Sequence, residues 1–400
     1  MTMNIATAIK FQHVIDPEDC ARCGSCEMEC ERGAISHDER NYVVDPAKCE
    51  TCLKCLAVCS TGSIDCWLPV QPGNEFSLAE QLAWDALPQQ PAHAADAAVQ
   101  KTFSSAAAVI ADAVLHAAPI SAAPPQVNLF SAHAPAVATV VESWRPTSGN
   151  DIRHIVLDFG DQVFPVLEGQ TIGILTPGGD ADGRPHAMRA YSVASARDGE
   201  HAGGNTVALT VKRIVENYAG EPVRGVCSNY LCDMGVGERV QVVGPYGQSF
   251  LAPNAPGTKI LMICTGTGIA PMRGMIERRC RHPVNEGDDL FLFYGARSPA
   301  DMPYYDDLIK LPPRRLDLNL AFSRLPSRTR EYVQDLLLRR AALVMDLLRD
   351  EQCYIYLCGV RGMEAAVMQA CAEICGMYDT DWSALETQLR AQRRLHIETY

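Results

Sequence analysis

The chain has 400 residues, of which 47% are hydrophobic, and its formal net charge is −13. This length is typical of about two to four domains, and the negative charge argues against binding to nucleic acid. We find no apolar run of about 18 residues or more, so we expect no transmembrane helix. Residues 1–11 lack the apolar segment of a signal peptide. Together with 17 cysteines, this predicts a reducing, cytoplasmic location.

Two copies of one cysteine pattern lie near the start of the chain. The pattern is C-x2-C-x2-C-x3-C, formed once by Cys20, Cys23, Cys26 and Cys30 and again by Cys49, Cys52, Cys55 and Cys59. This spacing is typical of bacterial ferredoxins, where it holds two [4Fe–4S] clusters and the fourth cysteine of each run ligates the other cluster. We therefore expect one cluster on Cys20, Cys23, Cys26 and Cys59, and a second on Cys30, Cys49, Cys52 and Cys55.

Other chemistry for these cysteines is less consistent with the pattern. A zinc site needs four ligands and no third cysteine in each run, and disulfides would suit a secreted chain. The proline that usually follows the fourth cysteine is replaced by Glu31 and Ser60. We expect this replacement to alter the solvent exposure and the potential of the clusters.

Residues 1–68 are accordingly predicted to form an α+β ferredoxin-like domain. Residues 69–135 are rich in alanine and proline, which indicates a linker that is extended at its prolines. Helical periodicity around residues 99–116 predicts one helix within this linker.

The rest of the chain has two patterns. Short strands are predicted at 137–141, 154–159, 206–212 and 239–243, which favours an antiparallel β-barrel over residues 136–253. From residue 254 onward, predicted strands alternate with helical segments such as 332–349 and 363–375. These strands are predicted at 259–264, 290–294, 318–322 and 354–358, and the alternation indicates an α/β domain with a parallel sheet over residues 254–400.

A glycine-rich turn follows the first of these parallel strands and opens a helix. It reads Thr265-Gly266-Thr267-Gly268-Ile269-Ala270-Pro271, and its backbone N–H groups can approach a pyrophosphate. Three further segments follow the same order along the chain: Arg-Ala-Tyr-Ser at 189–192, Gly-Val-Cys-Ser-Asn-Tyr-Leu at 225–231 and Cys-Gly-Val-Arg-Gly-Met at 358–363. With the ending Ile-Glu-Thr-Tyr at 397–400, they resemble the plant-type ferredoxin–NADP reductase family over residues 136–400.

The resemblance implies that the barrel binds FAD. Arg189 can place a cation on the diphosphate, Tyr191 can stack on the flavin ring and Ser192 can bond near its reactive nitrogen. The full set of implied FAD contacts is Arg189, Ala190, Tyr191, Ser192, Lys212, Gly225, Val226, Cys227, Ser228, Thr267 and the terminal Tyr400. The resemblance further implies that Ser192, Cys358, Glu398 and Tyr400 act in hydride transfer, with Tyr400 covering the flavin.

Nucleotide choice can be argued from the residues that follow a predicted strand. Arg324 and Arg330 suit a dianionic 2′-phosphate, Tyr332 can stack on adenine, and no acidic residue stands there to bind a ribose diol. NADPH is therefore predicted rather than NADH. The implied NADP contacts are Thr265, Gly266, Thr267, Gly268, Ser323, Arg324, Arg330, Tyr332, Gly359 and Met363.

In this order, the parts of the chain resemble the reductase components of aerobic benzoyl-CoA epoxidase systems. The resemblance implies electron flow from NADPH to FAD, then to two [4Fe–4S] clusters and on to a separate di-iron oxygenase, and it implies a homodimer. Three alternatives stay open: a reductase for another oxygenase or ferredoxin-type acceptor, an iron–sulfur redox sensor, and the reverse flow of electrons toward NADPH.

Overall fold

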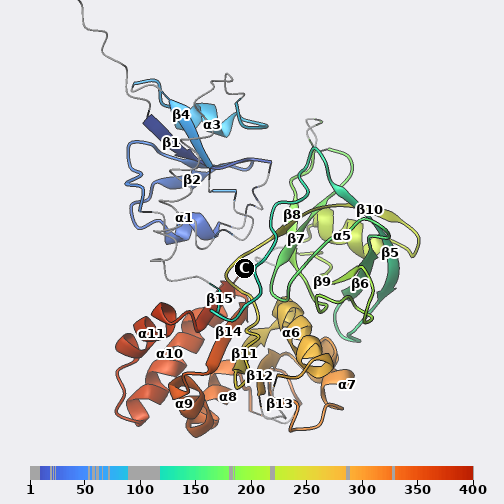
Figure 1. The fold of residues 1–400 in the computed structure, drawn as a ribbon, viewed down its shortest axis with the longest axis vertical. Helices are drawn as coiled ribbons and strands as arrows, with labels where there is room; N and C mark the ends of the chain where they lie inside the picture. The colour runs from blue at the N-terminus through green and yellow to red at the C-terminus, as the bar shows by residue number, and fades with distance from the viewer. Residues whose placement is uncertain are drawn as a thin grey trace, which may run out of the picture. The chain divides into compact units, whose positions relative to one another are not determined.

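The computed structural model describes residues 10–18, 20, 22, 24–52, 55, 59, 63–64, 66–70, 73–88, 118–179, 183, 185–216, 221–284, 289–326 and 329–399. The chain divides into two units, Met1–Ala117 and Ala118–Tyr400, which we treat separately. Figure 1 labels their elements. Within the described residues, no helix is long and apolar enough to cross a membrane. The helix predicted around 99–116 lies outside the described residues.

The first unit contains two antiparallel strand pairs. One joins β1 (Lys10–Val14) to β4 (Cys66–Val70), and the other joins β2 (Ile35–His37) to β3 (Tyr42–Val44). The short helices α1 (Ser25–Glu29) and α3 (Leu78–Leu82) accompany them. An α+β arrangement was predicted for this part of the chain, and it is confirmed.

The first unit extends beyond the boundary predicted at Leu68, which falls inside β4. Ser77 begins α3 with a capping box, because its hydroxyl accepts from the Glu80 N–H at 3.2 Å. The Asn41 side chain then donates to the carbonyls of Leu82 and Trp84 at 3.2 and 2.7 Å. These hydrogen bonds attach residues 73–84 to the first unit, although their composition suggested a linker.

The other end of the predicted linker packs on the second unit. Phe130 forms an antiparallel bridge with Gly244, and the Ser121 hydroxyl accepts from the backbone N–H of Asn254 at 3.0 Å. The described parts of residues 69–135 thus belong to the units on either side.

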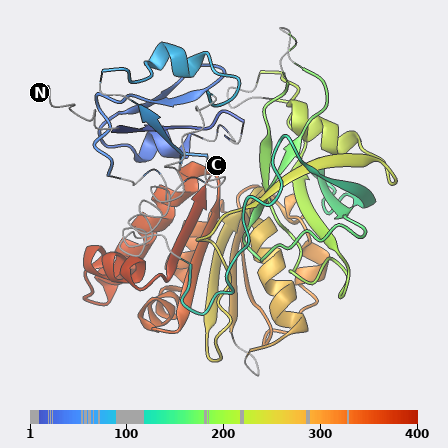
Figure 2. The same cartoon turned by 45° about the horizontal axis from the view of Figure 1, so that its top comes forward.

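After residues 118–135, the second unit forms a six-stranded antiparallel sheet in the order β8-β7-β10-β5-β6-β9. Its strands are β5 (Ala136–Trp144), β6 (Ile152–Asp158), β7 (Thr171–Leu175), β8 (Arg189–Ser192), β9 (Thr206–Lys212) and β10 (Arg239–Tyr246). A bridge between Val193 and Leu209 joins the two outermost strands, so the sheet closes into a barrel (Figure 2). The helix α5 (Val226–Asp233) packs against it, through Leu231 and Cys232.

Residues 254–400, which are predicted to bind the nucleotide and are called the nucleotide half below, contain a parallel sheet in the order β13-β12-β11-β14-β15. The strands are β11 (Lys259–Thr265), β12 (Leu290–Ala296), β13 (Asp317–Phe322), β14 (Cys353–Gly359) and β15 (Leu395–Thr399). The helical segments between them are η1 (Gly266–Gly268), α6 (Ile269–Arg281), η2 (Pro299–Asp301), α7 (Tyr305–Leu308), α8 (Val333–Arg339), α9 (Ala341–Arg349), α10 (Arg361–Met377) and α11 (Trp382–Ala391).

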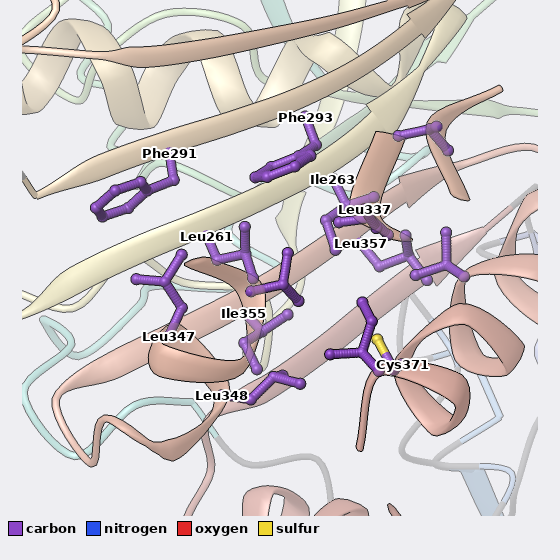
Figure 3. Close-up of a cluster of buried hydrophobic side chains, with 14 of the residues drawn as sticks. Leu261, Ile263, Phe291, Phe293, Leu337, Leu347, Leu348, Ile355, Leu357 and Cys371 are labelled. Carbon is purple, nitrogen blue, oxygen red and sulfur yellow. The ribbon is translucent and has the colours of Figure 1, made fainter. Parts of the chain in front are cut away.

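Alternate residues of β11 enter different cores on the two faces of this sheet. Leu261 and Ile263 pack with residues of α8, α9 and α10 (Figure 3), whereas Met262 packs with α6 on the opposite face. A strand buried on both faces explains its unbroken apolar run. The barrel and the covered parallel sheet confirm the predicted fold classes.

The periodic segment predicted over 332–349 is divided into two helices at Arg340. This residue has φ −104° and ψ 26°, which is outside the helical region. Its guanidinium donates to Asn319 at 2.6 Å and pairs with Asp317 at 3.2 Å, both on β13. A tertiary ion pair therefore coincides with the break, and hydrophobic periodicity alone gave no sign of it.

Candidate functional site

The two cysteine runs of the first unit are introduced by the same Asp-Pro turn. The Cys20 N–H donates to the Asp16 carbonyl at 3.1 Å, and the Cys49 N–H donates to the Asp45 carbonyl at 2.9 Å. Each turn is also hydrogen-bonded to the segment that follows the other cysteine run. The Asp16 N–H donates to the Ser63 carbonyl, which follows the second run, and the Asp45 N–H donates to the Ala34 carbonyl, which follows the first. The repeat Asp-Pro-x-x-Cys is the sequence signal for both turns.

Four of the predicted ligands surround one cavity. It is lined by Cys30, Cys49, Cys52 and Cys55, together with apolar residues such as Ile35 and Val44. These are the four cysteines expected to share the second cluster, and both runs contribute to them. They surround the space rather than meet at a point, because among the described residues no three His, Cys, Asp or Glu side chains could hold one metal ion.

The electrostatics of this cavity suit iron–sulfur ligation. Burial, followed by the neighbouring thiolates, raises the pKa of Cys55 to about 12, and burial also raises the pKa of Cys49. Four thiolates around one partly buried cavity would repel one another without a bound cation. Metal ligation supplies that cation and ionises the thiols, so the residues fit the expected cluster.

The first predicted set is described in part. Cys20 and Cys26 are each 8% exposed and share one core with Cys55. Cys59 packs against this core, and its sulfur lies 3.5 Å from the Ser63 hydroxyl. Cys23 and Ser60 lie outside the described residues. Glu31 is exposed, so the lost proline leaves a charged residue at the surface.

In the second unit, the predicted flavin residues begin at β8 on the barrel. Tyr191 pairs in register with Ile172, and Arg189 with Ile174. Burial raises the pKa of Tyr191, and the adjacent Cys227 adds to this effect. The phenol therefore stays neutral and presents an aromatic surface. Arg189 is exposed and leaves its cation accessible to an anionic group.

The start of α5 is shaped by Gly225 and Ser228. A Cβ at Gly225 would lie 2.7 Å from the Ser228 hydroxyl oxygen and 2.8 Å from Ile214 Cβ. The Ser228 hydroxyl accepts from the Ile214 N–H at 3.2 Å and donates to the Gly225 carbonyl at 3.3 Å. This side chain therefore fixes the loop against the helix, while Val226 is 50% exposed and Lys212 is exposed at the end of β9.

The glycine turn after β11 lies against the end of β14. A Cβ at Gly268 would overlap the carbonyl oxygen of Cys358, and one at Gly359 would lie 2.6 Å from Thr265 Oγ1 and 2.9 Å from the end of Met363. Thr265 Oγ1 is buried and makes no hydrogen bond within the described part of the chain. An unsatisfied buried oxygen in a site without side-chain bulk suits a polar ligand.

The strand register brings two predicted catalytic residues together. Cys358 on β14 pairs with Glu398 on β15. Burial raises the pKa of Glu398 to about 8. Burial also raises the pKa of Cys358, and the charge of Glu398 raises it further. In the described residues, no hydrogen bond joins Ser192 to this pair. Tyr400 lies outside the described residues, directly after the last residue of β15.

The residues predicted for the 2′-phosphate gather where β12 and β13 end. The Ser323 N–H donates to the Ala296 carbonyl at 3.0 Å, and the Arg324 N–H donates to the Arg297 carbonyl at 2.8 Å. Arg297 is exposed and was missed, because only the strand register reveals its position. The exposed Arg330 lies 3.4 Å from the Tyr332 hydroxyl, so the site gathers cations beside one aromatic ring.

A buried charge network, also missed, joins the barrel to the nucleotide half. Arg273 of α6 contacts Glu200 at 2.6 Å and Glu277 at 2.5 Å. Its guanidinium lies 4.8 Å from the ring centre of Tyr304, whose hydroxyl bonds to Thr210 on β9 at 2.6 Å. The contacts hold the flavin barrel and the nucleotide sheet in one arrangement.

Comparison with known families and proteins agrees with this geometry. A family described as "Oxidoreductase NAD-binding domain" matches residues 262–369, and one described as "4Fe-4S binding domain" matches residues 13–36. The ferredoxin–NADP reductase of Spirulina sp is 34% identical over 68% of this chain and 98% of its own length. The chloroplastic enzyme of Spinacia oleracea is 31% identical over 68% of this chain and 78% of its own length.

Solved structures agree at the level of the fold. The ferredoxin-NADP+ reductase of Plasmodium falciparum aligns with a TM-score of 0.53 and 21% identity, over 68% of this chain and 99% of that one. The chain therefore belongs to the ferredoxin–NADP reductase family, as an NADPH oxidoreductase with an additional 4Fe–4S ferredoxin domain.

Proposed function

We propose that this chain oxidises NADPH and passes the electrons, through FAD and two [4Fe–4S] clusters, to a separate oxygenase component. The observation that carries the proposal is the thiol-lined cavity of the first unit, built from Cys30, Cys49, Cys52 and Cys55 in the same chain as a reductase. Such a cavity suits a redox carrier that receives what the reductase delivers.

The proposed division of labour follows the chemistry of the groups. Bound FAD exchanges a hydride with a nicotinamide and single electrons with iron–sulfur clusters. The chain's own residues would bind and orient these groups. Arg189 would meet the diphosphate and Tyr191 would cover one face of the flavin, while Glu398, which pairs with Cys358, would lie beside the nicotinamide. Arg324, Arg330 and Arg297 supply the positive charge that favours a 2′-phosphate.

The finer proposal concerns the acceptor. The order of the parts resembles the reductase components of aerobic benzoyl-CoA epoxidase systems, so we propose the di-iron component of such a system as the acceptor. The homodimer implied by the same resemblance stays a prediction. A ferredoxin-type acceptor is the second candidate, because the family relatives are named for ferredoxin.

Anaerobic addition of NADPH tests the electron path. We expect the flavin absorbance to bleach first and the broad cluster absorbance to follow, in a chain that contains iron and sulfide for two clusters. If the flavin is reduced while fully loaded clusters are not, the path is wrong and a sensor role gains support. Mixing with a purified di-iron epoxidase component then tests the acceptor, because NADPH oxidation should become coupled to the epoxidation of benzoyl-CoA.

A further inference from the structure

One side of the helix α6 packs on the loop that follows the flavin strand β8. This helix lies between the barrel and the parallel sheet (Figure 1), and it begins directly after the glycine turn at Gly266–Gly268. The residues of α6 that face the loop recur at helical spacing and are Ala270, Arg273, Gly274, Glu277 and Arg281. The loop itself begins directly after Ser192, the last residue of β8. The contact therefore joins the segments that are predicted to hold the flavin and the nucleotide pyrophosphate.

The helix and the loop approach one another at backbone distance. A Cβ at Gly274 would lie 2.7 Å from the carbonyl oxygen of Ser195, so any side chain at this position would displace the loop. Next to this contact, Ala270 of the helix shares a small buried cluster with Ala194 of the loop and Val156 of β6. The separation of the two segments is therefore set by small residues on both.

Arg273 fixes the direction in which the loop lies against the helix. Its guanidinium donates to both carboxylate oxygens of Glu200, at 2.8 and 2.6 Å, and to the Ala194 carbonyl at 2.8 Å. The side chains of Arg273 and Glu200 are 14% and 9% exposed. Two parallel hydrogen bonds between planar groups restrict the angle as well as the distance. Arg281 adds hydrogen bonds to the carbonyls of Gly199, at 2.7 Å, and Glu200.

A second segment of the nucleotide half reaches the same carboxylate. The hydroxyl of Tyr304, which lies between β12 and β13, is 2.9 Å from Nδ1 of the buried His154 on β6. The other ring nitrogen of His154, Nε2, lies 3.3 Å from Glu200 Oε1. Nearby, the Ala300 carbonyl accepts from the Gly149 N–H of the barrel at 2.8 Å. Glu200 is thus held from α6 and, through His154, from the connection between β12 and β13.

We propose that Arg273 and Glu200 position the nucleotide half against the flavin barrel for hydride transfer. In that step a hydride leaves C4 of the nicotinamide with its electron pair and bonds to N5 of the flavin, giving NADP⁺ and reduced flavin. Transfer requires the reacting atoms to be held about 3–3.5 Å apart, and neither residue is a predicted contact of FAD or NADP. Loosening the pair should therefore slow transfer without weakening nucleotide binding. The inference rests on the proposed function for its first step alone.

The test separates alignment from binding in the full chain. Arg273→Lys retains the charge but loses the paired hydrogen bonds, and we expect NADPH to reduce its flavin about 10- to 100-fold more slowly in anaerobic stopped-flow experiments at saturating NADPH. The long-wavelength absorbance of NADP⁺ stacked on chemically reduced flavin should weaken. Calorimetry with adenosine 2′,5′-bisphosphate, which lacks the nicotinamide, should give an unchanged affinity. Glu200→Gln should act likewise, and the double variant should be no slower than the slower single variant, because both remove one contact.

Arg279→Lys is the matched control. Arg279 is a buried arginine of the same helix, but its charged partner at 2.9 Å, Asp289, lies within the nucleotide half. Its replacement should lower the free energy of unfolding while the rate of flavin reduction and the long-wavelength absorbance stay unchanged.

Wild-type reduction rates in Arg273→Lys and Glu200→Gln would overturn the inference. An equal loss of rate in Arg279→Lys would also overturn it, because lowered stability would then be the cause. Loss of FAD from the Arg273 and Glu200 variants alone would show that the pair is structural instead. A wild-type flavin that NADPH does not reduce would refute the proposed function itself, and the inference with it.

Discussion

The core of the ferredoxin unit and the core of the nucleotide half contain different kinds of side chain. In the first, Cys20, Cys26 and Cys55 lie among a few aliphatic side chains such as Ile35 and Ile64. In the second, the face shown in Figure 3 is filled by leucine, isoleucine, valine and phenylalanine from a sheet and the helices that cover it.

The difference concerns what each core needs in order to be stable. Large apolar side chains stabilise the folded chain through their own burial, so the nucleotide half requires no added group. Thiols are small, and a small unit buries little apolar surface. When a preformed site exists only in the folded state, the binding free energy of the metal becomes folding free energy. We therefore expect the ferredoxin unit to depend on its clusters.

The largest expected effect is the loss of a predicted ligand from the thiol core. Cys55→Ala should abolish the cluster of its set and destabilise the ferredoxin unit, because three thiols remain around the cavity. NADPH should still reduce the flavin, since the reductase core is unaffected. Absorbance spectra and limited proteolysis measure both effects. Cys66→Ala, outside both runs, should retain the clusters; equal damage from both variants would contradict the ligand assignment.

A large effect confined to the other core is expected from Phe293→Ala. Phe293 is 0% exposed, so its truncation should lower the free energy of unfolding of the reductase unit by about 3–5 kcal/mol. Urea denaturation followed by circular dichroism measures this, and cluster absorbance should be unchanged before unfolding. Ile309→Ala, at a residue that is 48% exposed, should cost about 0.5 kcal/mol or less. Equal costs would mean that this core does not carry the stability.

A smaller effect is expected on nucleotide preference, from two arginines at the predicted 2′-phosphate site. Replacing Arg324 and Arg330 with alanine should narrow the preference for NADPH over NADH by about 10- to 100-fold, since a charge-assisted hydrogen bond contributes about 1.5–3 kcal/mol. Steady-state kinetics with both nucleotides give the ratio. Arg339→Ala provides the control, because Arg339 is paired with Glu331 at 2.9 Å. An unchanged ratio in the double variant would place the phosphate elsewhere.

The last expected effect concerns the charge of buried carboxylates within the reductase unit. Burial raises the pKa of Glu277 from 4.5 to about 7, so the folded chain retains a proton that the unfolded chain has lost. Glu277 should therefore reduce the free energy of unfolding as pH rises from about 4.5 to 7, with no further loss above that range. Glu277→Gln should flatten this slope in denaturation at a series of pH values. A slope unchanged by the substitution would exclude Glu277 as its source.

Glu200 of the same network should act in the opposite direction. Burial opposes its ionisation, but hydrogen bonds from His154 and Arg273 prevail and lower its pKa to about 2. Its contribution is therefore present above about pH 4.5 and lost as pH falls toward 2.

The sequence predicted those features that depend on local patterns and on the spacing of cysteines. Strands such as β9 and the helix after the Thr265 turn follow directly from local patterns, and the cysteine spacing grouped four residues that the structure places around one cavity. It failed for β8 and β15. Arg189–Ser192 is a short strand without an apolar alternation, and β15 is recognisable only through its register with β14.

Tertiary contacts also lay beyond local patterns. Arg297 lies beside Arg324, a predicted phosphate contact, because β12 and β13 end side by side. Arg273 meets Glu200 across 73 positions of sequence. Composition alone assigned residues 69–135 to a linker, although Ser77 and Asn41 attach residues 73–84 of this stretch to the first unit. Contacts between residues that are far apart along the chain form only on folding, and they leave no periodic pattern in the sequence.

The register of β15 has a practical consequence for handling the protein. Thr399 pairs with Gly359. The strand β15 therefore carries the backbone to the carboxyl ends of the parallel strands, where Thr265, Gly268 and Cys358 lie. A purification tag or fluorescent fusion attached after Tyr400 would begin one residue beyond the pair of Thr399 and Gly359, close to residues that are predicted to bind the nicotinamide. Affinity tags for enzymology or for capturing the acceptor are therefore better placed before Lys10.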